Sequence, residues 1–212
     1  MKTIILTLLV ALIALSSCEN KKDKPSSSKP TLYEIKVAGR YGLIDSAGTI
    51  VVNPQFDAIF IPYHDKNYDL IAVRLGTKIG FIDRKGQFKI NPQFDYDTTG
   101  LPNLIEFSEG LAAVQQNKLY GYIDTTGKIV IKIQYEDCHF FKEGLASFQQ
   151  NKKWGFIDKT GKVVIEPQFD QAYFFENGIA EIRKFAQGET DDYPSLMGYV
   201  NRRGKVIWQP SN

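Results

Sequence analysis

The sequence predicts an all-β protein made of tandem three-stranded antiparallel meanders. They would form an open or curved β array, with a closed propeller-like arrangement as the alternative. One motif recurs five times at intervals of 34 to 43 residues, and such a period is typical of solenoids, propellers and other arrays. Each copy joins two runs rich in aromatic and β-branched residues through a short polar turn, which is a β-hairpin pattern. A further apolar segment follows each hairpin and supplies a third strand.

The hairpin turn has a physical mechanism. The five copies read GLIDSAG, GFIDRKG, GYIDTTG, GFIDKTG and GYVNRRG. Their first turn residue carries a short side-chain acceptor for the backbone N–H two residues on, and these residues are Asp45, Asp83, Asp124, Asp158 and Asn201. A glycine three residues later, such as Gly161, supplies the positive φ of a type I turn with a G1 bulge. The aspartates could also be Ca²⁺ ligands or catalytic carboxylates, but the asparagine of the fifth copy favours the turn.

The runs after the turn alternate as strands do. We expect pairs such as Val163 and Ile165 to point to one face, with the intervening residues largely covering the other. The prolines of the NPQFD and EPQFD segments cannot donate to a ladder, so they end this strand or place it at an edge. The third strand is expected over FSEGLAAV (107–114), FKEGLASF (141–148) and FENGIAEI (175–182). Short turns such as Asn117-Lys118 lead into the next hairpin, and five whole units give about fifteen strands.

The segment KWGFIDKTGKVVIEPQFD (153–170), together with the EGLA-type strands, resembles the bacterial WG-repeat family, named for a Trp-Gly pair found here at Trp154-Gly155. The resemblance covers about residues 32–210. It departs from the family pattern where other residues replace the tryptophan, namely Tyr41, Ile79, Tyr120 and Met197. It implies an all-β array and no known activity. Trp154 could be a stacking platform for a glycan, but the aliphatic residues at its place in other copies favour a ladder of core residues.

The N-terminus has the pattern of an export signal. Residues 1–17 contain one basic residue and an apolar run too short to span a membrane as a helix. Leu15-Ser16-Ser17-Cys18 resembles a bacterial lipobox, with cleavage before Cys18 and lipid attachment to its sulfur; an ordinary signal peptide with an incidental cysteine is the alternative. Residues 18–30 would be the lipidated cysteine and a flexible tether, and 31–212 the repeat domain. We therefore expect a lipid-anchored protein of the bacterial cell envelope, on the outer membrane, facing the periplasm or the surface.

Charge excludes two classes of partner. The formal net charge is +2 and falls to +1 without the signal peptide, so there is no electrostatic footprint for nucleic acid and no polybasic patch for anionic lipid. The expected partners are the membrane, through the lipid on Cys18, and a protein or glycan of the envelope. We expect a monomer.

Residues for chemistry are few. Cys138 and His139 could suggest a thiol–imidazole pair, but neighbouring strand residues point to opposite faces, which favours a buried cysteine beside a histidine at an aromatic position. No zinc spacing, P-loop, GxSxG or HExxH motif occurs, so we expect no catalytic residue, metal or cofactor. The insertion 96–106 could carry a partner surface or form a lid over one end of the core. The insertion 184–195 contains Glu189, Asp191 and Asp192, which could hold a cation or meet a basic partner, although a solvated loop is favoured.

The expected function is a non-catalytic binding or scaffolding module for protein or surface glycan, because repeat arrays present extended surfaces. An envelope hydrolase or transferase with a site between repeats is the rival, and it would need paired carboxylates of perturbed pKa. A purely structural spacer is the third possibility.

Overall fold

The computed structural model describes residues 29–62, 68–96, 105–185 and 196–208. These residues form nineteen strands and no helix, so the prediction of an all-β protein is confirmed. It follows that none of the described residues belongs to a helix long and apolar enough to cross a membrane. The expected signal peptide and nearly all of the tether lie outside the described residues.

The strands form five units, each a meander in which successive strands pair antiparallel. Unit 1 contains β1 (Tyr33–Val37), β2 (Arg40–Ile44) and β3 (Ile50–Phe56). Unit 2 contains β4 (Ala58–Phe60), β5 (Leu70–Leu75), β6 (Lys78–Asp83) and β7 (Phe88–Asp95). Unit 3 contains β8 (Phe107–Ser108), β9 (Leu111–Gln116), β10 (Leu119–Asp124) and β11 (Ile129–Tyr135). Unit 4 contains β12 (Asp137–Cys138), β13 (Leu145–Gln150), β14 (Lys153–Asp158) and β15 (Val163–Phe169). Unit 5 contains β16 (Gln171–Glu176), β17 (Ile179–Lys184), β18 (Leu196–Asn201) and β19 (Val206–Trp208).

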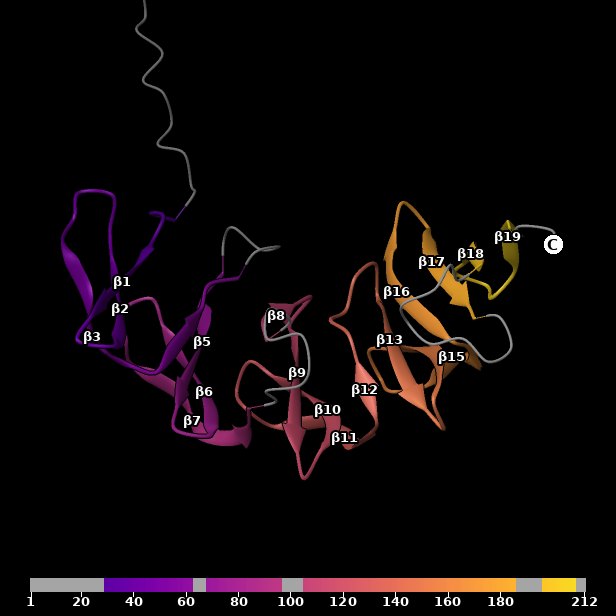
Figure 1. The fold of residues 1–212 in the computed structure, drawn as a ribbon, viewed down its shortest axis with the longest axis horizontal. Coiled ribbons are helices and arrows are strands. Elements are labelled where there is room, and N and C mark those ends of the chain that lie inside the picture. Colours follow the sequence, from indigo (N-terminus) through magenta and orange to yellow (C-terminus); the bar gives the residue numbers. More distant parts are fainter. Residues whose placement is uncertain (1–28, 63–67, 97–104, 186–195, 209–212) are drawn as a thin grey trace, which may run out of the picture.

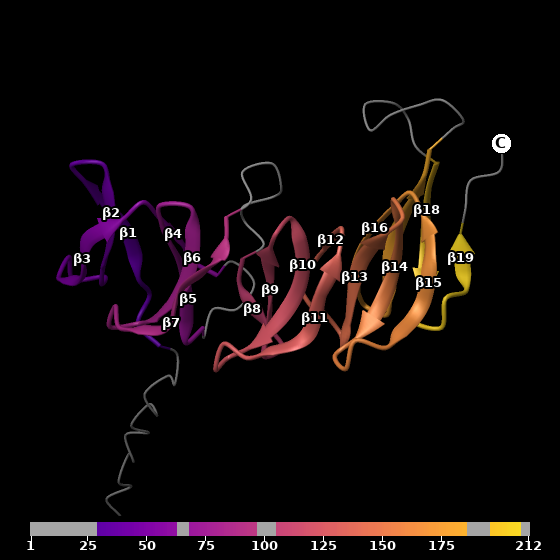
Figure 2. The ribbon, with the colours of Figure 1, turned by 90° about the horizontal axis from the view of Figure 1, so that it is seen from below.

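The five units stand side by side along an open arc (Figures 1 and 2). Units 1 and 5 lie at the two ends of the arc and do not meet, so the array does not close. The last strands of the units, such as β3, β7, β11 and β19, lie on the outer, convex side, whereas β8 and β16 lie nearer the open centre. The open or curved array expected from the sequence is therefore confirmed.

Units 2 to 5 have four strands rather than the three predicted. The segments 107–114, 141–148 and 175–182, expected to be single strands, each turn back in the middle. The turn residues have positive φ, as at Asn177 (53°) and Gly178 (81°), which matches the preference of two-residue hairpin turns for Asn-Gly pairs. The chain before each turn therefore forms the two-residue strand β8, the six-residue strand β16, or an isolated bridge from Lys142 to Leu145.

The hairpin turns have the predicted chemistry in all five copies. In the fourth copy, Asp158 Oδ1 accepts the backbone N–H groups of Thr160 (2.9 Å) and Lys162 (3.1 Å). Gly161 has φ of 83° and donates its N–H to the Asp158 carbonyl at 2.9 Å. Asn201 makes the same two side-chain bonds, at 3.0 Å each. The repeated acid is thus a turn residue.

The hydrophobic core lies between the units and not within them. One buried cluster joins Val52 and Phe56 of unit 1 to Ile71 and Ile82 of unit 2. Three further clusters join units 2 and 3, 3 and 4, and 4 and 5 in the same manner. Since each inner unit buries both faces of its sheet, removing one unit would expose apolar surface on two others.

In unit 4, the two residues of the outer strand that were expected to share one face point to opposite neighbouring units. Val163 packs on the cluster between units 3 and 4, whereas Ile165 belongs to the cluster between units 4 and 5. The register shifts between the pairs Phe156–Ile165 and Ile157–Val163, and such a bulge breaks the alternation of side chains. The intervening Val164 is 40% exposed on the convex side, so the expectation of a second covered face is also wrong.

The glycine of the WG pair is required by close approach of two backbones. A Cβ on Gly155 would lie 2.4 Å from the Ile165 carbonyl oxygen and 2.7 Å from the Pro167 nitrogen. Gly42, Gly80 and Gly121 meet the same obstacle on their outer strands. The bulged outer strand therefore crosses directly over a residue that can have no side chain.

Replacing Gly161 with Val is expected to lower the free energy of unfolding by at least about 1–3 kcal/mol. Positive φ is strained for a β-branched residue, and its Cβ would also lie 3.2 Å from Ile131 Cγ2 of unit 3. Gly48→Val, measured on dilute chain, is the matched control, because Gly48 has φ of 80° but no neighbour within 4 Å in its own chain. Urea denaturation should show a smaller loss for Gly48→Val. Equal losses would contradict the packing of units through this glycine.

Candidate functional site

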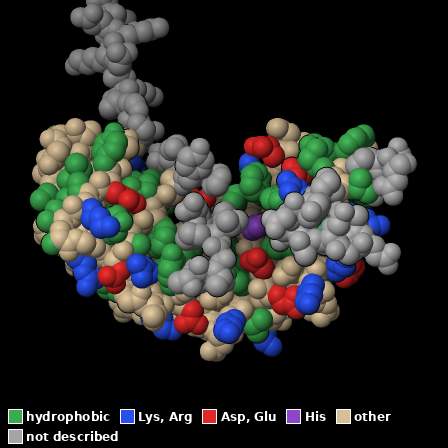
Figure 3. All heavy atoms as spheres, in the orientation of Figure 1, with side chains coloured by type: hydrophobic (Ala, Val, Ile, Leu, Met, Phe, Trp, Pro, Cys, Tyr) green, Lys and Arg blue, Asp and Glu red, His purple; other side chains and the backbone are tan. Residues whose placement is uncertain are grey.

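The concave side of the arc carries half-buried aromatic side chains. They come from the first strands of the units and from the chain beside them, and they include Phe60, Tyr96, Phe107, Tyr173 and Phe174. Figure 3 shows a hollowed centre of the molecule with hydrophobic side chains and a histidine on its wall. Of the described residues only His139 is a histidine, so this side chain is His139.

His139 lies between two aromatic rings. Its imidazole stacks on Trp154 of its own unit, with centroids 4.9 Å apart, and faces Tyr173 of unit 5 at 6.2 Å. Its Nδ1 lies 2.8 Å from the Ser147 hydroxyl. Burial lowers the pKa of His139 from 6.5 to about 4, although hydrogen bonding to the Ala172 backbone acts in the opposite direction. The imidazole is therefore neutral at physiological pH and joins units 4 and 5.

Cationic side chains accompany these aromatic rings. The Arg183 guanidinium lies 5.2 Å from the Tyr173 ring centroid, and the Arg74 guanidinium lies 5.0 Å from that of Tyr96. The Lys142 ammonium lies 4.5 Å from the ring of Phe174. Each pair has cation–π geometry. The concave side thus combines aromatic and cationic groups near two of its unit junctions.

The Cys138 thiol does not pair with the His139 imidazole. Cys138 is 4% exposed and packs in the cluster between units 3 and 4, beside Tyr122. Burial raises the pKa of this thiol to about 12, so it is not a thiolate at neutral pH and is a poor nucleophile. The prediction of a buried cysteine beside a histidine at an aromatic position is confirmed.

Trp154 is 6% exposed and Ile79, at the same place in unit 2, is 1% exposed. The prediction that this position forms a ladder of core residues is confirmed for Trp154 and Ile79. A buried Trp154 does not form a platform for a glycan. Met197, at the same place in unit 5, is 39% exposed. It differs because, among the described residues, no unit packs on the outer face of unit 5.

A second set of acids, not recognised from the sequence, clamps successive units together. Each stands where an outer strand passes into the next unit. Asp95 pairs with Lys78 of unit 2 and accepts the Asn117 backbone N–H of unit 3 at 2.8 Å. Asp57 and Asp170 make equivalent bridges, and Glu136 accepts the Lys152 backbone N–H at 2.8 Å. The available signal was the final acid of the two NPQFD segments and of EPQFD, which follows its basic partner by 17 residues in these three units.

These contacts lower the pKa of the three clamping aspartates, Asp57, Asp95 and Asp170. For Asp95 the causes are the Lys78 ammonium and then the Asn117 N–H, against a smaller effect of burial. For Asp57 the largest cause is the Gly76 N–H. In the turns, the Thr160 hydroxyl is the main cause for Asp158. These groups are held as anions, whereas a general acid needs a raised pKa.

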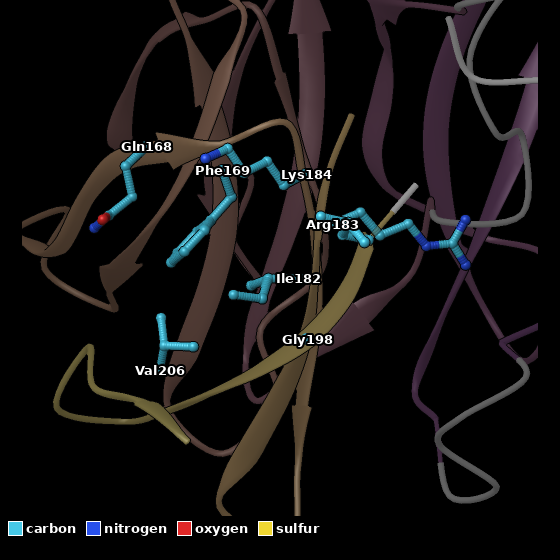
Figure 4. A pocket seen from close by; sticks show the side chains of 8 residues that line it. Gln168, Phe169, Ile182, Arg183, Lys184, Gly198 and Val206 are labelled. Carbon is cyan, nitrogen blue, oxygen red and sulfur yellow. The ribbon is translucent and has the colours of Figure 1, made fainter. Parts of the chain in front are cut away.

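A pocket of about 190 Å³ lies between β15 and strands β17 to β19. Phe169, Ile182 and Val206 point into it, and Arg183 extends away from it (Figure 4). In unit 2, Phe88 occupies the place of Val206 and packs edge-on against Phe56, with centroids 5.9 Å apart. The smaller Val206 leaves this space. The pocket is a packing gap rather than a set of convergent polar groups.

Several residues singled out from the sequence lie outside the described part of the chain: Cys18, Glu189, Asp191, Asp192 and most of both insertions. Their expected roles are not tested. Within the described ranges, no group of three or more His, Cys, Asp or Glu side chains could hold a metal ion.

Replacing His139 with Phe, the residue at the same place in unit 2, is expected to remove a pH dependence of stability. The folded-state pKa is depressed, so the unfolded chain takes up a proton at about pH 6.5 that the folded chain accepts only near pH 4. Stability of the native chain should therefore be full above pH 6.5 and fall by up to about 3 kcal/mol as the pH drops to 4. Thermal unfolding across this range measures the difference. An identical slope in His139→Phe would contradict the burial of a neutral imidazole.

The fold is similar to larger β-propeller-like structures. A structure of a eukaryotic initiation factor aligns with a TM-score of 0.56 and 13% identity, covering 88% of this chain and 53% of that one. Hsv2 from Kluyveromyces lactis aligns with a TM-score of 0.53 and 12% identity, covering 84% of this chain and 58% of that one. The chain thus spans slightly more than half the length of these structures, and identities this low show the fold alone.

No curated protein matches the chain. The model of a family described as WG containing repeat matches four tandem segments, at residues 41–78, 79–120, 120–154 and 154–184. These segments cover most of the chain and divide it near the Trp-Gly position of each unit. The chain belongs to the family of WG containing repeats.

Proposed function

We propose that this chain is an envelope-anchored, non-catalytic binding or scaffolding module that holds a protein partner on the concave side of its arc, with a surface glycan as the alternative ligand. The observation that carries the proposal is the set of half-buried aromatic and cationic side chains at the unit junctions, such as Tyr173 with Arg183. Tyrosine, tryptophan and arginine are the residues that most often dominate binding energy in protein interfaces.

The scaffold suits this role because its units are fixed to one another. Buried clusters and carboxylate clamps join every neighbouring pair. A surface on units fixed in this manner loses little conformational entropy when it binds a partner. A structural spacer would gain nothing from half-buried aromatic side chains on one side, so the binding role is preferred to it.

The rival, a hydrolase or transferase, finds little support in the acids of the described residues. Asp57, Asp95 and Asp170 accept backbone N–H groups that fix the fold. The aspartates Asp83, Asp124 and Asp158 do the same in the hairpin turns. Acids engaged in this way are structural.

The anchor in this proposal is the lipid on Cys18, with residues 18–30 as the tether, on the outer membrane of a bacterial envelope. Cys18→Ser is expected to move the chain from the membrane fraction to the soluble fraction. A variant that still sediments with membranes would contradict the anchor and leave the binding role intact.

The binding role is tested by capture from detergent-solubilised envelope with full-length chain as bait. Tyr173→Ser and Arg183→Ala should each lower the amount of captured partner by roughly tenfold, which corresponds to about 1.4 kcal/mol. Val130→Ser is the matched control, because Val130 is 41% exposed on the outer strand β11. Circular dichroism checks that all three variants fold. Equal capture by the native chain and both concave variants would contradict the proposal, and loss only on glycosidase treatment would assign the partner as a glycan.

A further inference from the structure

Among the described residues, the two ends of the arc carry copies of the interface that joins its units, without a further unit packed on them. At each internal junction, an aliphatic side chain from the outer strand of one unit packs on the turn glycine of the next. Side-chain atoms of Val52, Ile90, Ile131 and Ile165 lie 3.0 to 3.5 Å from the Cβ positions of Gly86, Gly127, Gly161 and Gly204. The same contact thus occurs four times. We call it the knob-on-glycine contact, where the knob is the aliphatic side chain of the outer strand.

The outer face of unit 1, the N-terminal end face, has the apolar row that unit 2 buries. Tyr33 pairs with Ile44 across β1 and β2, just as Ile71 pairs with Ile82 across β5 and β6. Tyr33 therefore corresponds to Ile71, and Ile44 corresponds to Ile82. The end-face residues at these and the neighbouring positions are Tyr33, Ile35, Val37, Ile44 and Ile50. Tyr33 is 49%, Val37 57% and Ile50 55% exposed, whereas Ile71 and Ile82 are fully buried. Gly48, the turn glycine of this face, has nothing within 4 Å.

The outer face of unit 5, the C-terminal end face, has the opposite half of the interface. Its residues Ile179, Met197, Tyr199 and Trp208 stand at the positions of Leu145, Trp154, Phe156 and Ile165, all of which are buried against unit 5. Trp208 is 53% exposed, whereas Ile165 is 3% exposed. The Tyr199 and Trp208 ring centroids are 6.4 Å apart, so the knob at this end belongs to an aromatic patch.

We propose that copies of this chain associate head to tail, with Trp208 of one copy on the Gly48 turn of the next. The C-terminal end face presents the knob Trp208 with no glycine to receive it, and the N-terminal end face presents Gly48 with no knob packed on it. The two end faces are therefore complementary to each other, and neither is complementary to itself. Terminal repeats that remain soluble as monomers have polar outer faces, and neither end face here has one. Such a contact is heterologous and produces a closed ring or an open filament. It differs from the monomer expected from the sequence and does not depend on the concave ligand.

The first test is disulfide trapping of full-length chain in native membranes. The Cβ position of Gly86 lies 3.5 Å from Val52 Cβ, and that of Gly161 lies 3.9 Å from Ile131 Cβ, close to the spacing of about 3.8 Å in disulfides. The double variant Gly48→Cys/Trp208→Cys should therefore form a series of linked dimers, trimers and larger species on oxidation. Mixing the two single variants should give linked dimers only.

Controls separate this result from unspecific oxidation and misfolding. The single variants carry the same two native cysteines, and linked species from either one alone, at the yield of the double variant, would overturn the proposal. Val52→Cys/Gly86→Cys should form its disulfide within one chain and shows that a cysteine is tolerated at this φ. If that internal control links and the end-to-end pair does not, the proposal is wrong.

A second measurement uses chains without new cysteines. Sedimentation of the native protein in mild detergent should show a mass that rises with concentration, and Trp208→Asp should return it to a single chain. Val164→Asp, an equally polar change on the convex side, should leave the association unchanged. A native chain that stays a single copy at every concentration, or a Trp208→Asp variant that associates as the native chain does, would overturn the proposal.

Discussion

The structure depends on the fact that each unit buries its apolar faces only against its neighbours. A single unit of a repeat array cannot bury its hydrophobic faces alone, and stacking on neighbouring units buries a continuous core. The knob-on-glycine contact, such as Ile131 on Gly161, sets how closely two units approach. The glycine of the Trp-Gly pair contributes to the same contact from within the unit. Gly155 allows the outer strand to bulge, and the bulge directs Ile165 toward the next unit. Two glycines in each repeat therefore fix the spacing of the array.

Hydrogen bonds and ion pairs also hold neighbouring units in position. Asp95 holds the middle strand of one unit and the hairpin turn of the next, so its two partners cannot move independently. A second ladder runs through the Glu-Gly turns, where Glu109 accepts the Gly144 N–H at 3.0 Å and Glu143 accepts the Gly178 N–H at 2.9 Å. Both sets of contacts, the carboxylate clamps and the Glu-Gly turns, act at junctions between units. Together they fix the curvature of the arc. The concave surface follows from that curvature, and cation–π pairs such as Arg183 with Tyr173 lie at its unit junctions.

The repeat period and turn chemistry were sufficient to predict the fold class, the hairpins and the structural role of the turn acids, because these depend on residues close in sequence. The additional strand in units 2 to 5 was missed, although Asn177-Gly178 carries a hairpin signal. The apolar residues on both sides of that turn masked it. The opposite orientations of Val163 and Ile165 could not be read from alternation, since the bulge that separates them forms only when Gly155 meets the outer strand. The stacking of His139 between Trp154 and Tyr173 required the placement of unit 5 beside unit 4.

Because the core lies at the junctions, the stability of a unit depends on the number of its neighbours. Native-state hydrogen exchange on dilute, unassociated chain measures this directly. Strands of units 2 to 4, which are buried on both faces, should exchange more slowly than the matching strands of units 1 and 5 by at least about tenfold, or about 1.4 kcal/mol in opening free energy. Equal protection in β2, β10 and β18 would mean that each unit is stable by itself, and it would contradict a core that lies between the units.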